Sequence, residues 1–116
     1  MAKSDKIDDI LKIIRDQRTF LICSHANPDG DSIGSQLAFY SFLVELGKEA
    51  YILNANPIPF NYVFLPYSSA FQTQLNSVNI DDIDIAIIFD CPNLDRIGDE
   101  ISPNVKSIRE IINIDH

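Results

Sequence analysis

Apolar residues along this 116-residue chain follow two spacings, one typical of helices and one typical of buried strands. Between residues 5 and 17, apolar side chains recur at i, i+3, i+4 and i+7, which predicts an amphipathic helix. A second helical pattern covers residues 31–46 and ends at Gly47, a residue type favoured just beyond a helix C-terminus. Short apolar runs bounded by turn residues predict buried strands at residues 19–24, 50–53, 84–89 and 110–114.

These patterns also predict which side chains pack in the core. The second helix is expected to bury one stripe of residues: Ile33, Leu37, Tyr40 and Val44, with Leu43 alongside. The less regular stretch after residue 54 is expected to contribute Phe64, Leu65 and Phe71, with a short strand near residues 69–74. Residues 94–99 are expected to form a short helix or loop, and residues 102–104 a turn.

Helical and strand patterns alternate along the chain, which is typical of parallel βαβ connections. The predicted fold class is α/β: a three-layer, Rossmann-like domain with a mostly parallel sheet. In such sheets, ligands bind outside the carboxyl ends of the strands. Polar residues that directly follow the apolar runs are therefore expected to meet at one edge of one sheet.

Composition narrows the classes of protein that this chain can belong to. Hydrophobic residues make up 46% and charged residues 22%, and no run of eighteen apolar residues predicts a membrane span. The polar N-terminus does not resemble a signal peptide, so we expect a cytoplasmic protein. A net charge of −8 argues against a nonspecific nucleic-acid binder but not against a phosphate substrate held through metal ions. Cys23 and Cys91 are expected to be small buried residues.

The candidate chemistry begins where the first predicted strand ends. His25, Asp29 and Asp31 fall within one tight loop, with Gly30 between the two aspartates. Two carboxylates so close together repel each other unless a cation neutralises them. One imidazole with two carboxylates suits manganese or iron better than calcium.

Two other interpretations apply to the same loop. Aspartate is common in turns, and Asp31 or Ser32 would serve as the N-cap of the second helix. The alternating Asn27, Asp29 and Asp31 also resemble the first ligands of an EF-hand calcium loop. That loop requires Gly at its sixth position and Glu at its twelfth, where this chain has Ser32 and Ala38, so we reject it.

Two later strand ends carry similar residues. Asp90 directly follows the run at residues 84–89, and Asp115 and His116 follow the last run. Together with the first loop they can hold two metal ions if Asp90 bridges them, an arrangement that supports displacement at phosphorus. Asp115 would then orient a ligating histidine. Taken singly, Asp90 is equally explained as the end of a strand, and His116 as an unstructured terminus.

These residues resemble known motifs. Residues 24–35 (SHANPDGDSIGS) resemble the first motif of the DHH phosphoesterase superfamily, and residues 89–98 (FDCPNLDRIG) resemble its second motif. The final Ile114-Asp115-His116 resembles the start of the Asp-His-His triplet that names the superfamily. The sequence of these motifs is most similar to that of the nanoRNase and pAp-phosphatase branch, whose members are also called RecJ-like phosphoesterases.

The resemblance implies a parallel α/β domain with two Mn²⁺ ions, with Mg²⁺ or another divalent metal as the alternative. It implies that His25, Asp29 and Asp90 hold one ion, and that Asp31, Asp90 and His116 hold the other. It places Asp90, Asp115 and His116 at the catalytic centre of a phosphodiesterase or exonuclease-type hydrolase. The implied substrate is a short oligonucleotide or nucleotide phosphate, such as a short oligoribonucleotide or pAp.

The sequence departs from the superfamily after His116. The second histidine of the triplet, the fourth motif and the smaller C-terminal substrate domain have no counterpart in residues 1–116. We therefore expect an N-terminal portion of a DHH domain that is inactive or very slow alone, in an oligomeric state that the sequence leaves open. Two alternatives stay open: a non-catalytic metal- or nucleotide-binding domain, and a hydrolase related to type II pyrophosphatases.

Overall fold

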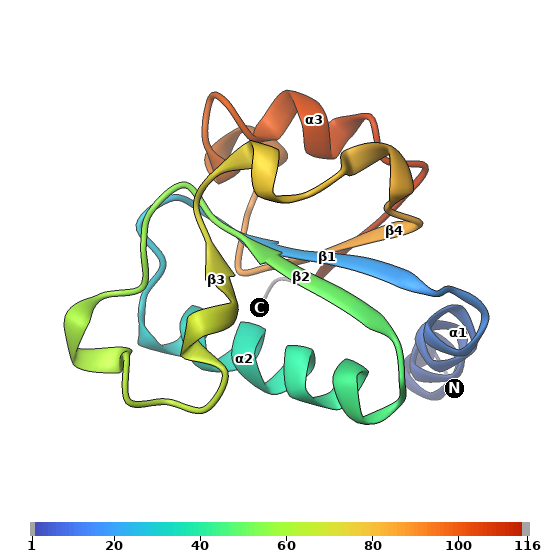
Figure 1. Cartoon of the computed structure of the whole chain (residues 1–116). Coiled ribbons are helices and arrows are strands. Elements are labelled where there is room, and N and C mark those ends of the chain that lie inside the picture. Colours follow the sequence, from blue (N-terminus) through green and yellow to red (C-terminus); the bar gives the residue numbers. More distant parts are fainter. Residues whose placement is uncertain (1, 115–116) are drawn as a thin grey trace.

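The computed structural model describes residues 2–114, and side chains from residue 8 onward. Its strands form one five-stranded sheet, ordered β3-β2-β1-β4-β5, in which every described pair is parallel (Figure 1). The strands are β1 (Thr19–Ser24), β2 (Glu49–Leu53), β3 (Phe71–Gln72), β4 (Ile85–Phe89) and β5 (Glu110–Ile114). The predicted parallel α/β fold class is therefore confirmed.

Helices cover both faces of this sheet, which gives the three layers (Figure 1). The α-helices are α1 (Ala2–Asp16), α2 (Gly30–Glu45) and α3 (Ser102–Lys106). Single 3₁₀ turns occupy Phe60–Tyr62, Ser68–Ala70, Leu75–Ser77, Ile80–Asp82 and Leu94–Ile97. Among the helices described, none is both long and apolar enough to cross a lipid bilayer.

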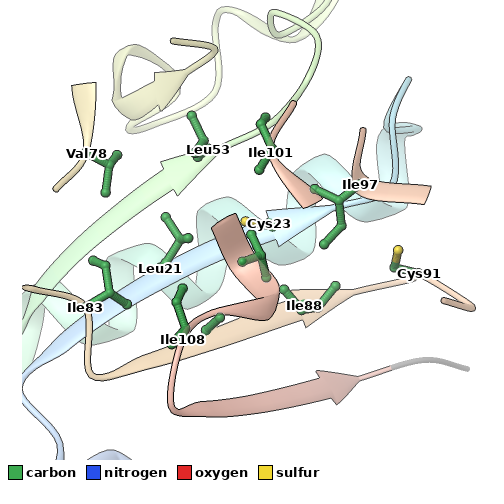
Figure 2. Close-up of a cluster of buried hydrophobic side chains, with 12 residues drawn as sticks. Leu21, Cys23, Leu53, Val78, Ile83, Ile88, Cys91, Ile97, Ile101 and Ile108 are labelled. Atoms are coloured by element: carbon green, nitrogen blue, oxygen red, sulfur yellow. The ribbon is translucent and has the colours of Figure 1, made fainter. Parts of the chain in front are cut away.

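The core consists of one apolar layer on each side of the sheet. On the face of α1 and α2, side chains of β1 and β4 such as Phe20 and Ile87 pack against Ile14, Ile33 and Leu37. On the opposite face, Figure 2 shows a second cluster around Leu21, Cys23 and Ile88. There α3, the 3₁₀ turns and the residues that flank them supply Val78, Ile97, Ile101, Val105 and Ile108. Strands β1 and β4 are buried along their whole length, as their continuous apolar sequences predict.

Helix α2 begins and ends where capping rules place its termini. The Asp29 side chain accepts a hydrogen bond from the Ser32 backbone N–H, so Asp29 is the N-cap. Beyond the last turn, Gly47 adopts a φ of 77°, the left-handed conformation that glycine reaches without steric strain. The helix therefore runs from the carboxyl end of β1 back to the amino end of β2.

Three packing predictions are wrong. Val44 is 39% exposed, because Leu43 takes the buried position at this end of α2. Phe64 is 78% exposed, whereas Leu65 and Phe71 pack on the core as predicted. Residues 102–104 start α3 instead of forming an isolated turn, because a proline is tolerated in the first turn of a helix, where its missing N–H has no intrahelical partner.

Candidate metal centre

The register of the strands brings two candidate ligands to neighbouring positions. Ser24, the last residue of β1, pairs with Phe89, the last residue of β4. His25 and Asp90 directly follow this pair, so their backbones leave the sheet side by side at its carboxyl edge. Phe89 also pairs with Ile114 at the end of β5, which places a third strand end at the same level.

His25 is half-buried, and one of its ring nitrogens is already engaged. Its Nδ1 lies 2.7 Å from the backbone carbonyl oxygen of Ala26. A carbonyl oxygen only accepts hydrogen bonds, so Nδ1 carries the proton and the Nε2 lone pair is left to act as a ligand. Ligating histidines in metal sites show this arrangement, in which the second nitrogen is fixed by a backbone or carboxylate acceptor.

The two aspartates of the first turn have different local roles. Asp29 is exposed, and its Oδ1 lies 2.9 Å from the Ser32 nitrogen that it caps. The capping interpretation is therefore correct for this turn, but it applies to Asp29 and not to Asp31 or Ser32. Asp31 is an exposed residue in the first turn of α2, where the helix dipole stabilises a negative charge. The cap uses one oxygen of Asp29, which leaves the second oxygen of the carboxylate as a donor for a cation.

Asp90 has an unusual backbone conformation. Its φ is 51°, in the left-handed region that aspartate and asparagine tolerate better than other non-glycine residues. Its backbone N–H donates to the carbonyl oxygen of Ile114, with a nitrogen–oxygen distance of 3.0 Å. The turn after β4 is thus tied to the end of β5.

The first turn is also tied to more distant segments. The ideal Cβ of any residue replacing Gly30 would lie 2.6 Å from the Tyr62 hydroxyl, so another side chain closely approaches the backbone at this glycine. Its φ is not positive; the left-handed residue of this turn is Asn27, with a φ of 57°. The Asn27 backbone N–H donates to Asn56 Oδ1 at 2.7 Å, which joins the turn to the loop after β2.

Four of the five predicted metal ligands lie in the described part of the chain, and Asp115 and His116 lie outside it. Within residues 2–114, no group of three or more His, Cys, Asp or Glu side chains is close enough together to hold a metal ion. The set implied for the first ion, His25, Asp29 and Asp90, therefore does not form such a group in the described part of the chain, and the ligand assignment stays a prediction. The donor chemistry fits Mn²⁺, because neutral imidazole and carboxylate oxygens are ligands that this ion accepts.

Sequence reasoning missed a buried polar chain directly behind the first turn. Ser24, Ser32, Gln36 and Asn54 are each fully buried and are connected through their side chains. A detectable signal was present, since Gln36 interrupts the apolar stripe of α2 and Asn54 directly follows the apolar run of β2.

The two cysteines flank the candidate site without joining it. Cys23 precedes Ser24 and Cys91 follows Asp90, and both side chains are fully buried, as predicted. Burial raises the pKa of the Cys23 thiol far above its usual range, and the neighbouring Cys91 raises it further. Cys23 therefore stays protonated near neutral pH and is a poor metal ligand there.

A parallel sheet with histidine and aspartates at its carboxyl edge defines a class of α/β proteins that bind ligands at strand ends. The family model of the DHH family N-terminal domain matches residues 19–116. The chain belongs to the DHH family.

Individual relatives agree with this assignment. A bifunctional oligoribonuclease and PAP phosphatase, NrnA, from Thermus thermophilus is 44% identical over 45 residues, which are 39% of this chain and 13% of NrnA. The uncharacterised protein MG371 of Mycoplasma genitalium is 30% identical over 113 residues, 95% of this chain and 33% of MG371. The crystal structure of an exopolyphosphatase-related protein from Bacteroides fragilis superimposes with a TM-score of 0.86 at 30% identity. That superposition covers 97% of this chain and 35% of the other, so the chain spans about a third of the length of these longer relatives.

Proposed function

We propose that this DHH domain binds two Mn²⁺ ions and takes part in hydrolysing phosphoester bonds of short oligoribonucleotides or pAp in the cytoplasm. DHH family membership supports a phosphoesterase, and the partial match to NrnA supports this substrate class. The observation that carries the proposal is the strand register. It aligns the ends of β1, β4 and β5, each of which is followed by a predicted ligand.

In this proposal each residue has a distinct task. His25 offers Nε2 because Nδ1 is engaged by the Ala26 carbonyl, and Asp29 offers the carboxylate oxygen that the helix cap does not use. Asp90 would contribute a ligand to both ion sites, Asp31 and His116 would complete the second site, and Asp115 would orient a histidine. When bound, the ions would lower the pKa of a water molecule and neutralise charge that develops on the phosphoryl oxygens.

The first test is titration of the 116-residue chain with Mn²⁺ by calorimetry. The informative variants are Asp29→Asn and Asp90→Asn, because asparagine still caps a helix and still tolerates a left-handed backbone. Each variant therefore removes a charge and keeps the local conformation. We expect affinity to fall by about 100-fold or more, beyond the 10–100-fold typical of losing an outer-shell partner.

Asp16→Asn is the matched control, since Asp16 is an exposed carboxylate at the end of α1, before the amino end of β1. It should leave Mn²⁺ affinity unchanged. Absence of Mn²⁺ binding by the folded wild-type chain, or equal losses in all three variants, would contradict the proposed metal centre.

The substrate is tested separately by following hydrolysis of a diribonucleotide, pAp, pyrophosphate and polyphosphate. We expect the diribonucleotide or pAp to be cleaved fastest. Preferential cleavage of polyphosphate would instead favour the activity suggested by the name of the exopolyphosphatase-related protein from Bacteroides fragilis. Mn²⁺ binding with hydrolysis of none of the four substrates is the result expected both of a DHH portion that is inactive alone and of a non-catalytic metal-binding domain.

A further inference from the structure

The buried polar chain behind the first turn links three elements of the fold at the carboxyl edge of the sheet. It starts at Asn54, after β2, whose Nδ2 donates to Gln36 Oε1 at 2.8 Å. Gln36 Nε2 in turn donates to Ser32 Oγ at 3.4 Å, and Ser32 Oγ lies 2.5 Å from Ser24 Oγ at the end of β1. Polar groups are rarely placed in a core unless they are hydrogen-bonded in this way.

Ser32 is the residue at which this chain meets the candidate site. Its backbone N–H holds the Asp29 carboxylate, and its hydroxyl is hydrogen-bonded to Ser24, the residue immediately before His25. One side chain and one amide of the same residue therefore restrain the segments that carry two predicted ligands. Gln36 adds a further restraint, because its Nε2 donates to the Ser32 hydroxyl and its Oε1 accepts from Asn54.

The chain of polar groups is not needed for packing. An apolar residue of similar size at position 36 would fill the same space in the face of α2 that packs on the sheet. In addition, Asn54 Oδ1 is buried with no hydrogen-bond partner in the described part of the chain, an energetic penalty that an apolar residue would avoid. Retaining such groups is explained if they fix the geometry of the turn above them.

We propose that Ser32 and Gln36 are positioning residues, which hold His25 and Asp29 in the geometry required for metal binding. This inference rests on the proposed function, since it requires that these two residues bind a metal ion. Ser32 and Gln36 do not touch the metal; they act through Ser24 and through the Asp29 carboxylate. Outer-shell partners of this kind typically change metal affinity by about 10–100-fold when they are removed.

The test compares two buried serines. Ser32→Ala removes the hydroxyl that joins the polar chain but keeps the backbone N–H that caps α2. Ser102→Ala makes the same chemical change at a serine whose hydroxyl is buried and has no hydrogen-bond partner among the described residues. Gln36→Met is a second variant, for use if Ser32→Ala does not fold. Methionine preserves the length of the glutamine side chain. Mn²⁺ affinity, the electron paramagnetic resonance spectrum at saturating Mn²⁺, and urea unfolding are measured for each.

We expect Ser32→Ala and Gln36→Met to weaken Mn²⁺ binding by about 10–100-fold and to alter the resonance spectrum. Ser102→Ala should leave both unchanged. Wild-type affinity and an unchanged spectrum in Ser32→Ala and Gln36→Met, whatever their unfolding midpoints, would overturn the inference and leave the metal centre intact. Failure of the folded wild-type chain to bind Mn²⁺ would instead overturn the proposed function, and this inference with it.

Discussion

The turns that follow β1 and β4 carry candidate ligands at neighbouring strand ends, but different parts of the chain hold them. The first turn is fixed by the helix that it starts: Asp29 accepts hydrogen bonds from the backbone N–H groups of Ser32 and Ile33. Between the second turn and residue 114, the structure has only a 3₁₀ turn and the short helix α3 before β5. Asp90 adopts a left-handed conformation, and its N–H donates to Ile114 in a strand that comes later in the sequence.

This difference separates a local from a non-local way of building a site. The first turn needs only a capping residue and a helical pattern within a few positions of each other. The second turn depends on β5 having paired with β4 in the correct register. Changes to the sheet should therefore affect the two turns unequally.

The largest effect is expected from the strand that supports both turns. Ile88 in β4 is fully buried, and β4 pairs with β1 on one side and β5 on the other. Ile88→Ala should lower the free energy of unfolding by about 2–5 kcal/mol, the usual range for a buried isoleucine. Ile112→Ala in the half-buried edge strand β5 should lower it by about half as much. Urea unfolding measures both losses. Equal losses would contradict the view that β4 supports both turns whereas β5 supports only the second.

A smaller effect, the difference in stability between a serine and a glycine variant, should have opposite signs in the two turns. Serine can cap a helix, so Asp29→Ser should be more stable than Asp29→Gly by a few tenths of a kcal/mol, about the loss known for glycine caps. At position 90 the left-handed backbone penalises a residue with a Cβ, so Asp90→Gly should be more stable than Asp90→Ser by about 1 kcal/mol. Thermal unfolding of the four variants checks both orders. The same order at both positions would show that the turns are held alike.

The same difference explains what could be predicted from the sequence. Strands β1 and β4 and helix α2 were predicted to within one residue, because an apolar run or a cap and a glycine define them locally. The motif in residues 24–35 that resembles the DHH family was visible for the same reason. The left-handed backbone of Asp90 was not predicted, because it depends on Ile114 across the sheet. The polar chain through Gln36 was missed, because only the fold brings Asn54 beneath the first turn.

The smallest effect concerns the buried cysteine that precedes the first turn. Burial raises the pKa of Cys23, so the folded protein keeps this thiol protonated at pH values where the unfolded chain ionises it. Stability from this source is fully present below the unfolded pKa of about 8.5 and is lost as pH rises above it. We therefore expect wild type and Cys23→Ala to differ by a constant amount up to neutral pH. Wild type should then lose more stability than the variant between about pH 8.5 and pH 10.

Urea unfolding of both proteins is measured across this pH range. The readout is the difference between their free energies of unfolding, in which the titration of the lysines and tyrosines that they share cancels. A constant difference up to pH 10 would contradict the prediction, since Cys23 would then titrate alike in the folded and unfolded chains. In the metal centre that we propose, a thiol that stays protonated in the fold would also account for the use of imidazole and carboxylate donors, although a cysteine lies two residues from His25.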